Sequence, residues 1–432
     1  MHNQPSNWST TTIEEVVDPQ RRVTYGIVQP GPRQREAEGV PLIRGQNYSS
    51  GIVSTDDLYY VLPRIANSYR RSSLEGGDLL LSIVGYVGAV AEVPETMAGA
   101  NITQTTARLA IAKPNVGRYF LYYFQSEQFH EEVKKYTKGS AQPGLNLADV
   151  VRMKAVAPPV PEQRLIAEIL DTVDLAIRKA EAMIAKLGQV KQGLLHDLLT
   201  RGIDDNGQLR DPDRHPEQFK DSPLGRIPKE WEITKLYDGV EFITDYRGST
   251  PPYAGDGIPV ISAENVGNGR VRSTTKFVTF DVYLRTSTRG FPEPGDVIFT
   301  TEAPVGEVAQ VPSDRPYRLT RRVIAIRPKK SWWRKNFLFW FVYYRARTGA
   351  WGAYMHGSTV PRILKPDILA RNTVKPGLAE QDQIAKVVDE HERRASDEVE
   401  SLAKLRLLKQ GLMDDLLTGR VRVTSLLQEA AT

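Results

Sequence analysis

Hydrogen-bonding side chains recur in this chain directly after short apolar runs and inside glycine-flanked turns. The run GVPLI at 39–43, for example, is followed by Arg44, Gln46 and Asn47. On loops held by a rigid scaffold, arginine suits guanine, glutamine or asparagine suits adenine, and a carboxylate accepts a hydrogen bond from cytosine. The sequence therefore indicates these candidate DNA contacts: Arg44, Gln46, Asn47, Ser82, Tyr86, Gln104, Thr105, Lys138, Ser140, Gln142, Ser262, Glu264, Asn265, Thr300, Thr301, Glu302, Arg321, Arg322, Ser358, Thr359 and Arg362.

The candidates fall at matching places in two halves of the chain. The segment 44–47 matches 262–265, and 104–106 matches 320–322. A single polar loop residue is usually only solvated, so the signal lies in the duplicated pattern. Because the residue types differ between the copies, we expect two domains that read different sequences.

No catalytic pattern accompanies these residues. The chain has no cysteine and only six histidines, and the histidines lack metal-ligand spacing, so disulfide scaffolds, cysteine zinc sites and thiol catalysis are excluded. It also lacks a G-x-x-x-x-G-K-[ST] phosphate loop, an H-E-x-x-H motif, a G-x-S-x-G turn and an N-P-P-[YF] run. We therefore predict no catalytic residue, no metal site and no cofactor in this chain.

The positive charge is concentrated in one segment. Lys and Arg total 57 against 52 Asp and Glu, for a net charge of +5. Residues 315–347 contain eleven Lys or Arg, nine aromatic residues and no Asp or Glu. The alternative is a solvated face over an aromatic core, and we expect most of the aromatic side chains to be buried. The missing carboxylates nevertheless favour a polyanionic partner such as nucleic acid.

The composition is that of a folded protein without a membrane span. Apolar residues make up 40% and charged residues 25% of 432 residues, a length that suggests about three domains. The longest apolar runs, such as 338–342, are far shorter than a bilayer requires. The N-terminus does not read as a secretory signal. We expect a cytoplasmic protein.

An internal repeat organises the whole chain. The segment VKQGLLHDLLT at 190–200 returns as LKQGLMDDLLT at 408–418, with eight of eleven positions identical. GVPLI at 39 and GIPVI at 257 have the same offset, 257 − 39 = 218. A period this long indicates a duplicated domain rather than a solenoid.

Each copy begins with short β-branched and aromatic runs broken by Gly and Pro, and ends in a long helical pattern. The sequence thus predicts an α/β (α+β) fold with two β-rich domains in tandem. The predicted boundaries are domain 1 at 1–160, helix 1 at 161–200, a surface linker at 201–228, domain 2 at 229–378, helix 2 at 379–419 and a tail at 420–432.

The two helices carry apolar residues at coiled-coil spacing. In the first helix one row recurs every seven residues, and we place a second row three residues after it. The first row is Ile166, Val173, Ala180, Leu187 and Leu194, and the second is Ile169, Ala176, Met183 and Val190. The second helix offers Ile384, Val387, Leu402, Leu405, Leu408, Leu412 and Leu416, interrupted at His391 and Glu398.

Two arrangements of these helices are open. Each helix could pack only on its own domain. We favour an antiparallel coiled coil between them, with pseudo-two-fold symmetry and pairing through Ile166, Val173, Leu187, Leu194, Ile384, Leu402, Leu405 and Leu412.

Taken in order, these motifs resemble the specificity subunit of type I restriction-modification systems. The resemblance rests on the paired G-[VI]-P-[LV]-I starts, the GDLLLS and GDVIFT segments, the PEQRLIAEIL and AEQDQIAKVV helix entries, KQGLLHDLLTRGID and SPLGRIPKEW. The first copy departs from the pattern, because it has only Asn7-Trp8 where the second has SPLGRIPKEW.

The resemblance implies a non-catalytic chain in which two target recognition domains each read half of a bipartite site in double-stranded DNA. It further implies that the helices set the gap and dock two adenine methyltransferase subunits, and that motor/nuclease subunits join them. S-adenosylmethionine, ATP and Mg²⁺ would then belong to those partners. The alternatives are a tandem coiled-coil adaptor that binds only protein, and a self-sufficient DNA-cleaving enzyme, which the missing motifs disfavour.

Overall fold

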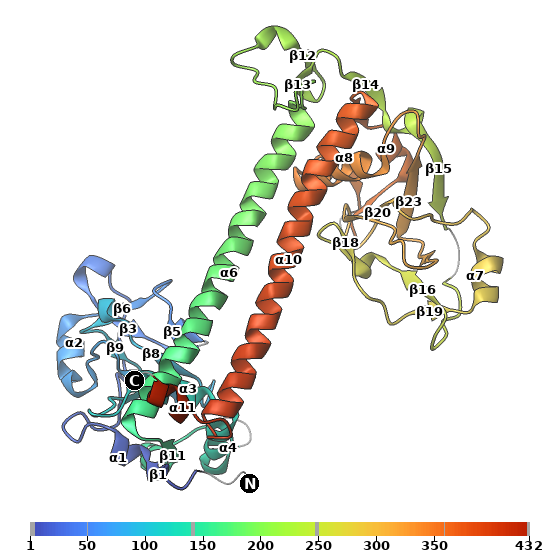
Figure 1. Cartoon of the computed structure of the whole chain (residues 1–432). Coiled ribbons are helices and arrows are strands. Elements are labelled where there is room, and N and C mark those ends of the chain that lie inside the picture. Colours follow the sequence, from blue (N-terminus) through green and yellow to red (C-terminus); the bar gives the residue numbers. More distant parts are fainter. Residues whose placement is uncertain (1–4, 50, 140–142, 247–249, 358, 430–432) are drawn as a thin grey trace. The chain divides into compact units, whose positions relative to one another are not determined.

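The computed structural model describes residues 5–49, 51–139, 143–246, 250–357 and 359–429. The chain divides into two compact units, Met1–Glu181 with Glu400–Thr432 (unit 1) and Ala182–Val399 (unit 2). Two long helices, α6 (Val160–Thr200) and α10 (Leu378–Leu416), cross the boundary between the units (Figure 1). They correspond to the helices predicted over 161–200 and 379–419. Each unit therefore contains one β-rich region and half of each helix.

The β-rich region of unit 1 contains short strands and short helices. The strands are β1 (Ser9–Thr12), β2 (Thr24–Tyr25), β3 (Val40–Ile43), β4 (Tyr48–Ser49), β5 (Gly51–Val53), β6 (Tyr59–Val61), β7 (Leu79–Ser82), β8 (Val90–Glu92), β9 (Asn101–Ile102), β10 (Thr106–Leu109) and β11 (Lys154–Ala157). The helices are α1 (Ile13–Val16), α2 (Pro63–Ser68), α3 (Gly117–Gln125), α4 (Glu127–Tyr136), α5 (Leu147–Arg152) and α11 (Thr424–Glu429).

Unit 2 repeats this plan with additional strands. Its strands are β12 (Phe219–Ser222), β13 (Gly225–Pro228), β14 (Glu232–Lys235), β15 (Val240–Asp245), β16 (Ile258–Ile261), β17 (Val266–Gly267), β18 (Arg270–Val271), β19 (Phe277–Val278), β20 (Val297–Thr300), β21 (Val308–Gln310), β22 (Arg318–Leu319), β23 (Val323–Pro328), β24 (Met355–His356), β25 (Arg362–Ile363) and β26 (Asn372–Lys375). Its helices are α7 (Phe280–Thr286), α8 (Lys335–Arg347) and α9 (Lys365–Leu369).

The two units share one sheet topology. The order β2-β10-β7-β8 in unit 1 corresponds to β15-β23-β20-β21 in unit 2, and β6-β3-β9 corresponds to β19-β16-β22. In both three-stranded sheets one neighbouring pair is parallel, β3 with β9 and β16 with β22. Every residue of β7 and of β20 is buried, because these strands lie between two apolar layers and therefore read as continuous apolar runs.

An aromatic helix joins each sheet to the long helices. Helix α3 and helix α8 each contribute a run of buried aromatic side chains to the main core of their unit. The Tyr122 hydroxyl donates to Asp171 of α6 at 2.7 Å, and the Trp340 indole N–H donates to Asp389 of α10 at the same distance. The expectation that most aromatic residues of 315–347 are core is confirmed.

A buried carboxylate fixes the start of α6. Glu162 is buried and accepts hydrogen bonds from the Trp8 indole at 3.2 Å and from the Arg422 guanidinium at 2.8 Å. Trp8 precedes β1, and Arg422 follows the end of α10. Three distant segments therefore meet at this one carboxylate.

The start of α10 is fixed in the same way. Glu380 accepts from the Trp231 indole at 2.9 Å and from the Arg210 guanidinium at 2.5 Å. Trp231 precedes β14, and Arg210 follows the end of α6. Trp8 is thus the structural counterpart of Trp231. The first copy lacks the segment SPLGRIPKEW, but it retains the tryptophan that donates to the carboxylate at the start of the long helix.

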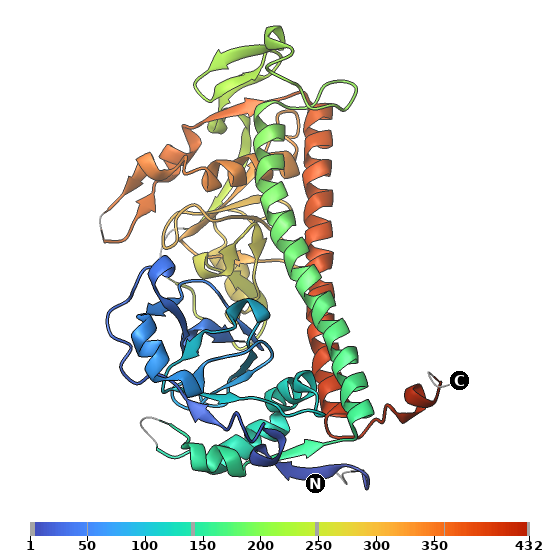
Figure 2. The same ribbon diagram turned by 90° about the vertical axis from the view of Figure 1, so that its left-hand side faces the viewer.

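The two long helices pair antiparallel inside each unit (Figures 1 and 2). In unit 1, Lys409 bonds Asp174 at 2.6 Å and Arg406 bonds Glu181 at 2.7 Å, so residue numbers rise along one helix as they fall along the other. In unit 2, Leu195, Leu198 and Leu199 of α6 share a core with Ile384 and Val388 of α10. The antiparallel pairing predicted from the sequence is confirmed.

The second apolar row of the seam differs from the sequence prediction. Ile169 and Ala176 are half-buried, but Met183 and Val190 are 39% and 46% exposed, and Val387 and Leu408 are also exposed. The inward-facing stripe of α6 instead continues four residues after each member of the first row, where Leu170 and Leu198 are buried and Ile177, Ile184 and Lys191 are half-buried. In a heptad the spacing between successive seam positions alternates between three and four residues. The first row occupies the position that is followed by the four-residue spacing.

The predicted pairing residues otherwise face inward. Ile166, Val173, Leu187, Ile384 and Leu402 are buried, and Leu194, Leu405 and Leu412 are half-buried. In unit 2 the polar interruption at His391 lies in the seam, where its Nε2 is 2.9 Å from the Leu187 carbonyl oxygen.

The segment 201–228, expected as a surface linker, is tied into unit 2. It contains the hairpin β12–β13, and Ile203, Phe219 and Ile227 are buried. None of the helices in the described part of the chain is long and apolar enough to cross a bilayer.

We predict that Glu380→Ala lowers the free energy of unfolding by about 3 kcal/mol, because it leaves the buried Arg210 guanidinium and the Trp231 indole without their main acceptor. Urea unfolding measures the change. Glu390→Ala, which removes an exposed carboxylate from the same helix, is the control and leaves the value nearly unchanged. Equal effects of the two substitutions would contradict the assigned role of Glu380.

Candidate nucleic-acid interface

The turn after β3 and the turn after β16 are built by the same asparagine. In unit 2 the Asn265 carbonyl oxygen accepts from the Ser262 backbone N–H at 3.1 Å, and its amide donates to the Ser273 carbonyl at 3.0 Å. In unit 1 Asn47 accepts from the Arg44 N–H at 3.0 Å and donates to Asp56 at 3.3 Å. Both asparagines are buried, so they shape the turns rather than face a ligand.

Two further candidates are also structural. Ser82 and Thr300 are fully buried at the ends of β7 and β20. Ser82 donates to the Val84 carbonyl at 3.2 Å, and Thr300 accepts from the Glu307 N–H at 2.9 Å. Ser82, Thr300, Asn47 and Asn265 are therefore no longer candidate DNA contacts, because their side chains are buried and hydrogen-bonded within the protein.

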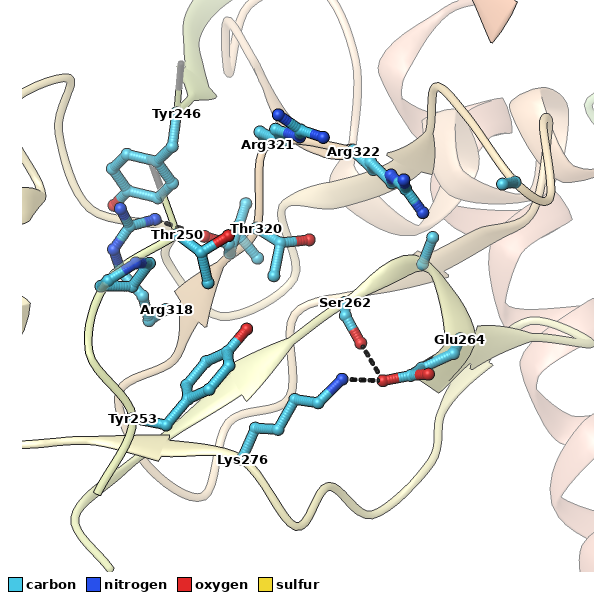
Figure 3. A pocket seen from close by; sticks show the side chains of 14 residues that line it. Tyr246, Thr250, Tyr253, Ser262, Glu264, Lys276, Arg318, Thr320, Arg321 and Arg322 are labelled. Carbon is cyan, nitrogen blue, oxygen red and sulfur yellow. Dashed lines mark hydrogen bonds and ion pairs between the residues drawn. The ribbon is translucent and has the colours of Figure 1, made fainter. Parts of the chain in front are cut away.

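Four of the remaining candidates of unit 2 line one pocket. A cavity of about 260 Å³ is lined by Ser262, Glu264, Arg321 and Arg322. These residues come from the turn after β16 and from the segment between β22 and β23. In Figure 3, Arg321 and Arg322 lie on one side of the pocket, and Tyr253 and Lys276 lie on the other. The structure therefore brings these four candidates together at one pocket.

An ion pair fixes the charge of Glu264. Its carboxylate accepts from the Lys276 ammonium group and from the Ser262 hydroxyl, the latter at 3.0 Å (Figure 3). These contacts hold the pKa of Glu264 below its usual value, and the carboxylate in turn raises the pKa of Lys276. Glu264 thus stays ionised near neutral pH and can act only as a hydrogen-bond acceptor.

The surface continues from the pocket to the turn after β20 and to β25. Arg322 forms an ion pair with Glu302 at 3.3 Å, and Glu302 lies opposite Arg362 in an antiparallel bridge. Thr301 is half-buried and accepts a hydrogen bond from the Ile363 N–H at 2.9 Å. Arg321 and Arg362 are exposed, and no ion pair to either is found within the described ranges. These two guanidinium groups are available to a ligand.

A buried arginine forms the floor of the pocket. Arg318 is 4% exposed, its guanidinium carbon lies 3.4 Å from the centre of the Tyr246 ring, and its Nε donates to the Thr286 hydroxyl at 3.2 Å. Burial lowers the pKa of Arg318 and raises that of Tyr246. No carboxylate among the described residues pairs with Arg318. Tyr246, Tyr253, Lys276 and Arg318 were missed by the sequence argument, because none of them lies in the turns that the repeat singled out; Arg318, for example, is in β22.

Unit 1 cannot form this pocket. Strand registers place Gly26 where unit 2 has Tyr246, and a Cβ at Gly26 would lie 1.7 Å from the Ile102 carbonyl oxygen. The unit 1 surface consists instead of projecting side chains: Gln46 and Gln104 are exposed, and Tyr86 is 74% exposed at the tip of its turn.

The other unit 1 candidates are partly engaged. Arg44 is half-buried with its guanidinium over the Tyr59 ring, Thr105 shares a hydrogen bond with Thr103, and Lys138 bonds Asp149 at 2.9 Å. In unit 2, Thr359 is exposed. Ser140, Gln142 and Ser358 lie outside the described residues.

The parallel strand pairs correct the alignment of the two copies. Ile43 faces Ile102 in unit 1, and Ile261 faces Leu319 in unit 2. Gln104 therefore corresponds to Arg321 rather than to Thr320, and Thr105 corresponds to Arg322. At these reading positions the two units carry different chemistry.

The basic run 315–347 carries less unpaired positive charge than its sequence indicates. Arg327 and Lys335 both pair with the buried Asp296 at 2.8 Å, and Arg334 pairs with Asp382 at 2.9 Å. These carboxylates come from other segments of the fold, so counting charges within the run overstates its free positive charge. Arg321, by contrast, is exposed, has no ion pair among the described residues, and lies on the candidate surface.

We predict that Asn265→Ala lowers the free energy of unfolding by about 1–3 kcal/mol, because it strands buried backbone groups of the turn. Glu264→Ala, one residue away and exposed, leaves stability nearly unchanged. Thermal unfolding measures both, and the pair Asn47→Ala and Gln46→Ala repeats the comparison in unit 1. If the exposed residue of either pair lost more stability than the asparagine, the assignment of the asparagines to the turns and of Glu264 and Gln46 to the surface would be contradicted.

Comparison with known proteins adds independent evidence. The model of the type I restriction modification DNA specificity domain matches residues 5–187. The type I restriction enzyme MjaVIII specificity subunit of Methanocaldococcus jannaschii is 27% identical over 321 residues, which cover 71% of this chain and 71% of that protein. The putative MjaX specificity subunit of the same organism is 24% identical over 439 residues, 97% of this chain and 95% of that protein.

The fold agrees with a solved structure as well. The S subunit of a type I restriction-modification system from M. genitalium matches with a TM-score of 0.58 at 13% identity, covering 96% of this chain and 97% of that one. The resemblance inferred from the sequence is confirmed. Residues 5–187 match the type I restriction modification DNA specificity domain, and the chain is similar over most of its length to type I restriction enzyme specificity subunits.

Proposed function

We propose that this chain recognises a bipartite site in double-stranded DNA, with unit 1 reading one half and unit 2 the other. The observation that carries the proposal is that two copies of one frame hold different side chains at equivalent positions. Gln46 and Gln104 of unit 1 correspond to Glu264 and Arg321 of unit 2.

The side chains suit different base edges. Glutamine makes paired hydrogen bonds with adenine, whereas arginine pairs with guanine and an ionised carboxylate accepts from cytosine. Arg321 is exposed and Glu264 is held ionised by Lys276. We infer that unit 2 reads a half-site richer in G·C pairs than the half-site of unit 1.

The proposal assigns the spacing of the half-sites to the paired helices. In it, α6 and α10 set the gap between the half-sites and dock two adenine methyltransferase subunits, and motor/nuclease subunits join for restriction in the cytoplasm. S-adenosylmethionine, ATP and Mg²⁺ belong to those partners. The described residues of this chain contain no group of three or more His, Cys, Asp or Glu side chains placed to hold a metal ion.

The direct experiment maps adenine methylation across the host genome with and without the gene for this chain. The proposal predicts that one two-part motif with a fixed gap loses methylation when the gene is deleted. Loss of a single uninterrupted motif, or no loss while the partner methyltransferase is still expressed, would contradict it.

We predict that one extra heptad in each helix, after Glu181 in α6 and after Val399 in α10, lengthens the pair by about 10 Å. At about 3.4 Å per base pair, the gap in the methylated motif grows by about three base pairs while both half-sites stay the same. Seven residues inserted after Asn206, in the exposed turn that follows α6, are the control and leave the gap unchanged. Altered half-sites with an unaltered gap would refute the role of the helices.

A further inference from the structure

Five arginines surround an open cavity at the edge of the large sheet of unit 1. The cavity measures about 550 Å³ and is lined by Arg21, Arg22, Arg70, Arg71 and Arg108. They come from the segment before β2, from the turn after α2, and from β10. None of them belongs to the contacts indicated by the sequence or to the reading positions described above.

Most of this charge is not neutralised. Arg21 is bound at 2.7 Å by the buried Asp78 and at 2.9 Å by the exposed Glu75. Arg22, Arg70 and Arg71 are exposed, and the described part of the chain provides no ion pair to any of them. Three free guanidinium groups therefore border one cavity.

A buried arginine holds the surrounding backbone in place. Arg108 is 4% exposed and donates to the carbonyl oxygens of Arg71 at 2.8 Å, Ser73 at 3.2 Å and Arg22 at 3.0 Å. Its Nε has no hydrogen-bond partner, and no described carboxylate pairs with it. Burial lowers the pKa of Arg108, and the positive charge of Arg21 adds to that effect. Arg108 thus positions the segments that carry Arg22 and Arg71, while the carboxylates of Asp78, Glu75 and Asp18 partly offset its charge.

Unit 2 lacks this arrangement. The position of Arg108 is occupied there by Ala325, according to the strand registers. Arg289, which corresponds to Arg71, has its guanidinium 3.8 Å from the Asp245 carboxylate. Arg285 similarly lies 3.6 Å from Asp281. The cluster is therefore a property of unit 1 and not of the shared frame.

The cavity is separated from the candidate surface of unit 1 by only a short stretch of chain. Arg108 lies three residues along the chain from Thr105, which is about 10 Å in an extended strand. Forked guanidinium groups without carboxylate partners match the oxygens of phosphate groups, which arginine binds through paired hydrogen bonds. Such contacts position a duplex but carry no sequence information.

We propose that the arginine cluster of unit 1 binds backbone phosphates of the DNA beside the half-site that this unit reads. The cluster forms a sequence-independent clamp that unit 2 does not have. This inference rests on the proposed function. It adds a surface that strengthens DNA binding without changing the DNA sequence that is recognised.

The test uses the complex purified through a tag on this chain and measures DNA binding by fluorescence anisotropy between about 50 and 200 mM salt, a range in which phosphate contacts dominate the salt dependence. The variant Arg70→Ala with Arg71→Ala is compared with wild type on a duplex that carries the methylated motif and on one that lacks it. Each phosphate contact contributes about 0.9 to the slope of log K against log salt. The double variant therefore reduces that slope by about 1.8 on both duplexes.

Two matched variants serve as controls. Arg70→Lys with Arg71→Lys keeps the charge and retains most of the wild-type slope. Arg285→Ala with Arg289→Ala removes two arginines that already lie beside carboxylates in unit 2, and leaves the slope unchanged. Mapping of methylation with the alanine variant returns the wild-type motif.

The outcomes separate this inference from the proposed function. An unchanged slope in the Arg70/Arg71 alanine variant, an equal loss in the Arg285/Arg289 variant, or a changed motif would overturn the clamp while leaving bipartite recognition intact. If the wild-type complex did not prefer the duplex with the motif, the proposed function and the clamp would both fall.

Discussion

The structure depends on one carboxylate at the start of each long helix, that of Glu162, which is buried, and that of Glu380, which is half-buried. Glu162 and Glu380 each accept from a tryptophan that begins one repeat and from an arginine that follows the helix of the other repeat. A carboxylate removed from water is stable only with such partners, so each repeat needs a residue from the other repeat to complete its fold. This is why each compact unit contains residues from both ends of the repeat and half of each helix.

The same frame then carries different chemistry. Residues that shape the turns are alike in the two units: Asn47 and Asn265 close equivalent turns, and Asp78 and Asp296 accept from equivalent backbone N–H groups at 2.8 and 2.9 Å. The side chains between these fixed points differ, from Gln104 to Arg321 and from Gly26 to Tyr246. A fold that keeps its turns while it changes the residues on them is suited to reading different sequences with one architecture.

Much of this organisation could be predicted from the sequence, because the repeat, the helix period and the polar turns are local patterns. The features that were missed arise from contacts between distant segments. The second row of the seam depends on which way α6 faces its partner, and this decides that Ile184 rather than Met183 is turned inward. The free charge of 315–347 could not be counted from the run alone, because its acids, such as Asp296 and Asp382, lie elsewhere in the chain. Asn265 looked like a contact because a buried turn-forming amide and an exposed one are identical in sequence.

The central claim is that equivalent positions on one frame determine what each unit reads. It is tested most directly by giving unit 2 residues of unit 1, with Glu264→Gln, Arg321→Gln and Arg322→Thr in one chain, and then sequencing the methylated motif. The account predicts that only one half-site changes, that it loses G·C preference, and that the gap and the other half-site stay as they were. A motif that is unchanged, or altered in both halves, would contradict it.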